Sequence, residues 1–352
     1  LDALERGSDA TTRDWLRRRF LAIVAGPLGA FEMHPEAQPL LLLEARAAGD
    51  LDGIVTGLSL GLVYAAVLGM EDPRQAEIEA LLDARGPSAG LEQRAFCDFT
   101  RAYALVVVGR YAEAASLLAR SIETAAGVRS RPWFVPQARL LQIACGWTRG
   151  RFDEVALAVS AARAEWTLQA QPGLLHQLEV FGGAFSELLE DRPRLAVWRL
   201  RRAELSKASP SLEFMRVAYL SGSLRAAGRP RVAQAIMLRH GRQLAPKLVE
   251  VFARVFLLWY LFVAVADRPR LGLARRLGLR MILAVMATSR APSGRAVRLL
   301  TWAGLELRGR RFRRGRALAR LARRELSALD MRPFAAAADD LVVAAEGREG
   351  GS

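Results

Sequence analysis

A short turn signal recurs along the chain at nearly constant spacing, between long runs of apolar and helix-forming residues. It places a proline or an aromatic residue beside arginine, glycine or aspartate, as in Asp72-Pro73-Arg74 and Gly109-Arg110-Tyr111. The proline or aromatic marker falls at positions 73, 111, 152, 193, 230, 269 and 312, so the intervals are 38, 41, 41, 37, 39 and 43 residues. Proline is tolerated in the first turn of a helix, and glycine commonly follows the last. The pattern therefore predicts pairs of helices that repeat about every 40 residues.

The segments between the markers have the 3–4 residue apolar spacing of helices that bury one face. Three residues after the marker, most copies carry a small residue, which we expect to face the preceding helix: Ala76, Ala114, Ala196, Ala233, Gly272 and Gly315, with Val155 as the exception. First helices are expected near 53–69, 91–108, 133–149, 173–190, 211–227, 247–266 and 293–309. Second helices are expected near 73–84, 112–126, 152–168, 194–206, 231–243, 270–287 and 312–328, with further helices near 11–24, 36–48 and 334–346.

These helices predict an all-α fold, an α-solenoid of about eight helical hairpins. We expect three parts: an N-terminal helix pair over 1–50, a repeat array over 51–330, and a closing cap helix with a tail over 331–352. The 352 residues are 52% hydrophobic. This excludes disorder as a description of the whole chain, because disordered chains are far less apolar.

Two of the turns carry a family resemblance. Gly-Arg-Tyr-Ala-Glu-Ala at 109–114 and Gly-Arg-Phe-Asp-Glu-Val at 150–155 resemble the start of the second helix of a tetratricopeptide repeat. The interval of about 40 residues is longer than the roughly 34 residues of the standard unit. The passages Glu44-Ala-Arg-Ala-Ala-Gly-Asp50 and Met331-Arg-Pro-Phe-Ala-Ala-Ala-Ala338 are similar to the C-terminal tetratricopeptide-like arrays of large bacterial signalling ATPases and multidomain Ser/Thr kinases.

That resemblance implies a helical tail that serves an attached kinase or ATPase module. The module itself is missing from this chain, which contains no Gly-x-x-x-x-Gly-Lys phosphate loop, no His-Arg-Asp and no Asp-Phe-Gly triplet. The chain begins at Leu1 rather than Met, so we expect it to be a processed or excised piece of a longer protein.

Catalytic and metal-binding patterns are weak. Gly57-Leu-Ser59-Leu-Gly61 matches a nucleophile elbow in letters, but an elbow needs a strand before the serine, and the surrounding pattern is helical. His34, His176 and His240 fall on separate expected elements, without cysteines or paired carboxylates at ligand spacing. Cys97 and Cys145 lie among apolar residues and are expected to be buried, inert thiols in a reducing compartment. We therefore expect a non-enzymatic protein without cofactor or metal.

Charge is distributed unevenly. The formal net charge is +15, and the cations are almost all arginine, since Lys207 and Lys247 are the only lysines. Residues 1–200 carry 21 cations and 25 anions (net −4), whereas residues 201–352 carry 30 cations and 11 anions (net +19). The arginines concentrate on the expected second helices of the last two pairs. The candidate partner-binding residues are Arg268, Arg270, Arg275, Arg276, Arg310, Arg313, Arg316, Arg320, Arg323 and Arg324.

Several functions fit these arginines. The first is a scaffold or sensor that binds a protein partner or effector, because arginine's planar fork pairs well with carboxylates, and that regulates the attached signalling module. The alternative is nucleic-acid binding through residues 268–324, and a third possibility is an anionic lipid surface. The non-functional alternative is that the arginines lie on a solvated face and reflect only a general preference for arginine over lysine in this chain.

The chain is expected to lie in the cytoplasm and to have no membrane span. Gly53–Met70 holds four glycines and is flanked by acids, and 255–266 is too short to cross a bilayer. The apolar segment 247–266 would form an exposed patch, suited to self-association, if its neighbours left it uncovered.

Overall fold

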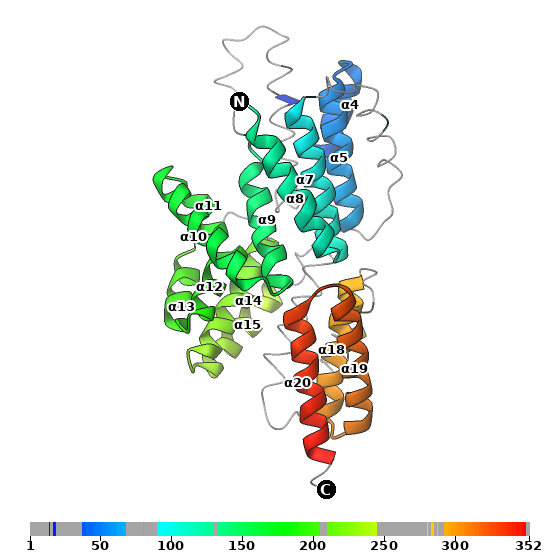
Figure 1. Ribbon diagram of the computed structural model, residues 1–352, viewed down its shortest axis with the longest axis vertical. Coiled ribbons are helices and arrows are strands. Elements are labelled where there is room, and N and C mark those ends of the chain that lie inside the picture. Colours follow the sequence, from blue (N-terminus) through cyan, green and yellow to red (C-terminus); the bar gives the residue numbers. More distant parts are fainter. Residues whose placement is uncertain are drawn as a thin grey trace.

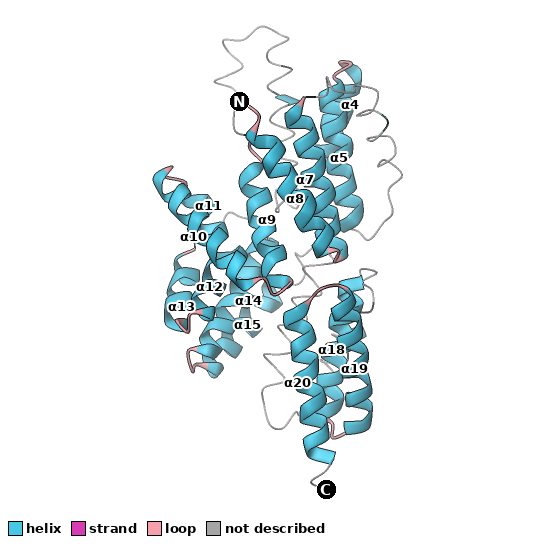
Figure 2. Cartoon of the chain, viewed as in Figure 1, coloured by secondary structure: helices cyan, strands magenta, loops and turns pink. Residues whose placement is uncertain are grey.

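The computed structural model describes residues 14, 17–18, 37–67, 80, 90–129, 132–203, 210–244, 280, 283–284, 287 and 292–349. Within these ranges the chain is all-α and contains no strand, as predicted (Figures 1 and 2). The helices are α4 (Ala37–Ala47), α5 (Leu51–Val67), α7 (Leu91–Val108), α8 (Tyr111–Ala126), α9 (Val135–Thr148), α10 (Phe152–Leu168), α11 (Pro172–Leu178), the π-helical segment η2 (Glu179–Gly183), α12 (Ala184–Leu189), α13 (Pro193–Arg202), α14 (Pro210–Ala226), α15 (Pro230–Leu244), α18 (Pro292–Arg308), α19 (Phe312–Ala328) and α20 (Arg332–Glu349).

Most described helices lie within two residues of their expected bounds. Two differ more clearly. The helix expected over 173–190 is interrupted by η2, and α13 ends at Arg202 rather than near 206 because Ala203 has an extended backbone. The expected helices at 11–24, 73–84, 247–266 and 270–287 lie outside the described residues, apart from isolated positions.

The turns between paired helices share one backbone geometry. In each, one of the first two residues after the helix has a positive φ, and the N–H of the following residue donates to a carbonyl five residues back, as from Arg110 to the Leu105 oxygen at 2.8 Å. This is the Schellman arrangement, in which glycine is favoured because it has no Cβ. The left-handed residues are Gly49, Gly109, Gly150, Ala170, Asp191, Gly228, Arg310 and Asp330, with φ between +49° and +87°. The turn signal read from the sequence is thus a helix C-cap followed at once by a new helix.

The small residues after the marker that the structure describes are buried, as positions facing the preceding helix should be, whereas Ala76 and Gly272 lie outside the described residues. Ala114, Ala196 and Ala233 are fully buried, and a Cβ on Gly315 would lie 2.6 Å from Leu307 of α18. The exceptional Val155 is accommodated by Gly146 on α9, where an added Cβ would lie 2.7 Å from the valine side chain. Helices α9 and α10 still approach closely, because the small residue at this contact is Gly146 on α9 rather than a residue on α10.

The C-terminal helices α18–α20 contact hairpins that lie far earlier in the sequence (Figure 1). The first turn of α18 touches the α7–α8 turn, where Ser293 Cβ lies 2.7 Å from the position of a Cβ on Gly109. The α19–α20 turn meets the α9–α10 turn through an ion pair of 2.8 Å between Arg149 and Asp330. In a simple linear array each repeat touches only its neighbours, so this contact adds a long-range closure that the repeat pattern does not contain.

Asp330 is held by two arginines at this closure. Its carboxylate accepts hydrogen bonds from Arg149 Nε at 2.8 Å and from Arg332 Nε at 2.9 Å. Partial burial opposes ionisation, but the two hydrogen bonds outweigh it and hold the pKa of Asp330 below its ordinary value. Trp147 and Phe334 pack beside the ion pair, with ring centroids 6.4 Å apart.

Candidate functional site

The predicted arginine surface divides into described and undescribed parts. Arg268, Arg270, Arg275 and Arg276 lie outside the described residues. The other candidates sit at the α18–α19 turn and along α19, which is amphipathic: its buried face consists of Gly315, Ala319, Ala322 and Leu326. Because these positions recur every three or four residues, the arginines between them are turned toward the flanks and the outer ridge of the helix.

The flanks of α19 are tied to its neighbours by ion pairs. Toward α20, Arg320 pairs with Glu346 at 2.9 Å and Arg323 with Asp339 at 3.0 Å. Toward α18, Glu325 pairs with Arg295 at 3.0 Å. These side chains are mostly half-exposed, so each pair contributes little stability on its own, on the order of 0–1 kcal/mol. Part of the predicted binding surface therefore serves to join three helices.

Two more arginines of this region contact α18. Arg314 lies over the ring of Trp302, with 5.0 Å from its Cζ to the ring centroid, and Arg311 Nη1 lies 3.3 Å from Glu306. Glu306 is buried and also accepts a hydrogen bond from Trp302 Nε1 at 2.9 Å. These contacts fix the α18–α19 turn.

The outer ridge of α19 is different. Arg310, Arg313 and Arg324 are exposed and form no ion pair or hydrogen bond with any other part of the chain that the structure describes. Arg316, on the same helix, does have a partner. Of the six described candidates, three remain available to an external anion, and the helix beneath them is held on both flanks.

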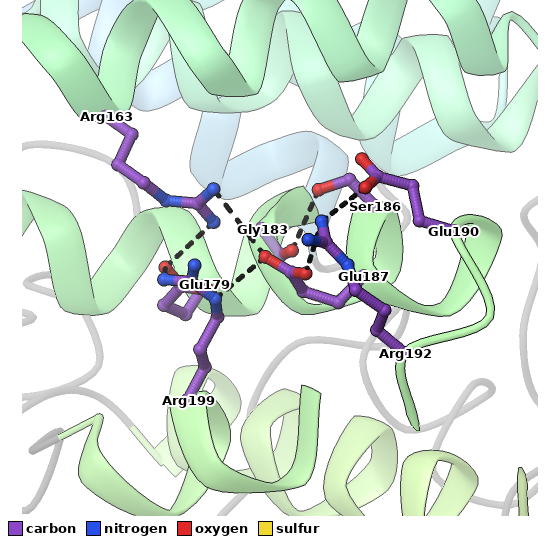
Figure 3. Close-up of polar contacts among 8 residues, drawn as sticks. All are labelled: Arg163, Glu179, Gly183, Ser186, Glu187, Glu190, Arg192 and Arg199. Carbon is purple, nitrogen blue, oxygen red and sulfur yellow. Dashed lines mark hydrogen bonds and ion pairs between the residues drawn. The ribbon is translucent and has the colours of Figure 1, made fainter. Parts of the chain in front are cut away.

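A second cluster, which the sequence did not reveal, lies where α10, η2, α12 and α13 meet (Figure 3). We call it the Glu–Arg network: Arg163, Glu179, Glu187, Arg192 and Arg199. The side chain of Glu187 is 2% exposed and that of Glu179 is 10% exposed, so both carboxylates are withdrawn from water. Burying carboxylates is costly unless opposite charges and hydrogen bonds compensate.

Three guanidinium groups supply the opposite charges. Arg163 Nη2 donates to Glu179 at 3.0 Å, and Arg199 Nε lies 2.8 Å from Glu187 Oε1. Arg192 approaches the other oxygen of Glu187 at 2.8 Å and also pairs with the exposed Glu190. Figure 3 shows Arg163 and Arg199 reaching the glutamates from opposite sides. The network thus runs from the buried interior to the surface at the α12–α13 turn.

The π-helical segment brings the two glutamates into place. At Gly182 an added Cβ would lie 2.4 Å from the Ile143 side chain of α9, so only glycine permits this approach. At Gly183 an added Cβ would lie 2.6 Å from the Glu179 carboxylate. The sequence signal was the pair of acids eight residues apart in an otherwise apolar segment, with Gly182-Gly183 between them.

The weak catalytic pattern has a structural explanation. Ser59 lies in the middle of α5, is buried, and its Oγ is 3.4 Å from Cys97 Sγ. Gly57 approaches α4, where an added Cβ would lie 3.2 Å from Leu42, so the glycines permit close helix packing. The strand–turn–helix context of a nucleophile elbow is not present at this serine.

Both cysteines are free and buried. Burial raises the pKa of Cys97 to about 11 and that of Cys145 to about 12. His176 and His240 lie on α11 and α15, whereas His34 falls outside the described ranges.

Two comparisons with known proteins find no match. No protein-family model matches the chain, and a search of curated proteins finds no match either. In the portion of the chain with described structure, none of the helices combines the length and the apolar character needed to cross a bilayer.

Proposed function

We propose that this chain is a tetratricopeptide-like scaffold, an α-solenoid of about eight helical hairpins, which binds an acidic protein partner and passes that binding to an attached signalling module. Support for the repeat architecture comes from the described helix pairs, which are joined by turns of one geometry at the sequence markers. Support for the attached module comes from the resemblance to the arrays of bacterial signalling ATPases and kinases. The proposed function is binding rather than catalysis.

The outer ridge of α19 carries the proposal. Arg310, Arg313 and Arg324 are exposed and unpaired within the described structure, whereas Arg320 and Arg323 are already paired with α20. An arginine guanidinium presents a planar set of donors that suits a carboxylate, and it cannot lose its charge at physiological pH. A partner with appropriately spaced Asp or Glu side chains would satisfy all three without disturbing the ion pairs that join α18, α19 and α20.

Charge reversal on the ridge tests the proposal. The double variant Arg313→Glu/Arg324→Glu would be compared with Arg231→Glu/Arg239→Glu, which changes the net charge equally on exposed positions of α15. Proteins captured from native lysate by the unchanged chain would be identified, and their dissociation constants measured. We expect at least a tenfold loss of affinity for the α19 variant and little change for the α15 variant, because close charge pairs at interfaces contribute about 1.5 kcal/mol or more.

Nucleic-acid binding is the competing outcome. A mixed DNA and RNA pool would be titrated in parallel at rising salt, because binding to phosphates weakens steeply as counterions are released. Tight, salt-sensitive binding to the pool that the α19 variant abolishes would overturn the protein-partner proposal. Equal losses in the α19 and α15 variants would also contradict it, since they would indicate net charge rather than a defined surface.

A further inference from the structure

A second exposed surface lies on α13. Ala196 and Leu200 form the buried face of this helix, and both are fully buried. The opposite face bears the exposed side chains of the α13 stripe, which we define as Arg194, Trp198, Arg201 and Arg202. Their spacing of three, four and seven residues places them on one side of a helix. No acidic residue occurs between Pro193 and Arg202, so the stripe is uniformly basic around one large aromatic ring.

Trp198 is unusually exposed for its size. Half of its surface is accessible, whereas Trp166 on α10 is fully buried. The guanidinium of Arg202 lies over the Trp198 ring, with its Cζ 4.9 Å from the ring centroid. Such a cation–π contact holds the ring in place while the edge of the guanidinium stays able to donate hydrogen bonds. Arg194 and Arg201 have no ion-pair or hydrogen-bond partner in the described ranges.

The Glu–Arg network anchors the helix beneath this stripe. Arg199 points inward from α13 and lies 2.8 Å from Glu187 and 3.4 Å from Glu179. Arg192, which precedes the first residue of α13, holds Glu187 from the other side. Helix α13 therefore contributes Arg199 to the buried network and exposes the three arginines of the stripe on its opposite face. A surface on a rigidly held element loses less freedom when it binds, which favours affinity.

We propose that the α13 stripe docks an acidic, amphipathic helical segment of a protein partner, with an apolar side chain against Trp198 and carboxylates on Arg194 and Arg201. Tryptophan and arginine are the residues most enriched among those that dominate binding energy at protein interfaces. The ten residues of α13 span about 15 Å, the length of nearly three turns of a partner helix. Single-stranded nucleic acid is disfavoured because its sites extend over a groove with successive aromatic platforms, whereas α13 offers one ring.

This inference rests on the proposed binding function but concerns a surface separate from α19. The probe is a fluorescein-labelled synthetic peptide about as long as α13, with glutamates three or four positions apart along one face and a central leucine on the same face. Binding to the full chain would be followed by fluorescence anisotropy. A scrambled peptide of the same composition controls for charge, and single-stranded oligothymidylate serves as the nucleic-acid probe.

Three variants distinguish the outcomes. Trp198→Ala and Arg194→Glu/Arg201→Glu alter the α13 stripe, and Arg313→Glu/Arg324→Glu alters α19 alone. We expect each α13 variant to weaken peptide binding about tenfold or more, in line with interface anchors, and the α19 variant to leave it within about twofold. Circular dichroism should remain unchanged, because Trp198 is half-exposed and the two arginines are exposed.

Several results would overturn the inference. Peptide binding that is absent, equal for the scrambled sequence, or unaffected by the α13 variants would do so. If oligothymidylate binds more tightly than the peptide and this binding depends on Trp198, the occupant of the α13 stripe is nucleic acid and the inference of a protein partner is wrong. Peptide binding lost only in the α19 variant would refute the α13 stripe while leaving the proposed function intact.

Discussion

Replacing Gly109 by alanine tests the long-range closure between α18 and the α7–α8 turn. Gly109 has φ +87°, and an added Cβ would lie 2.7 Å from Ser293 Cβ and 3.3 Å from the Ser293 backbone nitrogen. The left-handed backbone alone costs an alanine about 1–2 kcal/mol, and overpacking a tight contact adds about 1–3 kcal/mol. Lower unfolded-state entropy returns about 0.4–1 kcal/mol. We therefore expect Gly109→Ala to lower the free energy of unfolding by about 2–3 kcal/mol.

Gly228→Ala is the matched control. Gly228 occupies the same position in the α14–α15 turn, with φ +75°, but nothing lies within 4 Å of an added Cβ. Gly228→Ala should lower the free energy of unfolding by about 1 kcal/mol, which is the backbone strain of alanine minus the stabilisation from lower unfolded-state entropy. The difference between the two variants therefore isolates the contact with α18.

Urea unfolding followed by circular dichroism measures both free energies, and hydrogen exchange in the first turn of α18 reports the contact directly. Adding Ser293→Gly to Gly109→Ala should recover much of the excess penalty, because it removes the atoms that the new methyl group meets. Equal penalties at Gly109 and Gly228, or no recovery in the double variant, would refute the closure.

Three further results are expected. Glu187→Gln should destabilise the protein by about 1–3 kcal/mol in urea unfolding, because it removes the charge of a buried carboxylate that three guanidinium groups approach. Glu190→Gln at the exposed end of the network should cost less than about 1 kcal/mol, and similar costs would contradict the burial of the network. The pKa of Asp330 is lower in the folded protein than in the unfolded chain, so its stabilisation of the closure should be complete above pH 4 and lost as pH falls through the folded pKa. Hydrogen exchange in α20 should show this loss. Asp330→Asn should remove the pH dependence. Burial raises the pKa of Cys97 to about 11, so its thiol should react with a thiol reagent at pH 8 only at the rate of local unfolding. The free energy of unfolding should decline as pH rises from 9 toward 11, because the thiol ionises in the unfolded chain first. Rapid labelling of the native protein would contradict the burial of Cys97.

The local chemistry of the sequence determined the described helices. Helices begin at the marker residues Pro193, Tyr111 and Phe152. The residue before each marker ends the C-cap of the preceding helix, so the marker falls in the first turn of the next helix. The small residues after the markers also predicted buried positions, and Gly315 meets Leu307 of the preceding helix as expected. The same regularity made Val155 look anomalous, and only the tertiary structure showed that Gly146 compensates for it.

The candidate sites were less predictable. An arginine on a helix surface has the same local sequence whether it pairs with a neighbouring helix or faces solvent. Arg320 and Arg323 therefore appeared equivalent to Arg313 and Arg324 until the structure placed Glu346 and Asp339 beside the first two. The prediction identified the basic helix, but it did not identify which of its arginines are available.

By itself, the sequence determined the helix pairs, their turns and the accumulation of positive charge toward the C-terminus, because each depends on residues close together in the chain. Tertiary structure decided the Glu–Arg network, the exposure of Trp198 and the Arg149–Asp330 closure. Arg149 and Asp330 are 181 positions apart, and no periodicity links them. Such contacts depend on how the helices pack in three dimensions, where a single glycine such as Gly182 determines how closely two backbones approach.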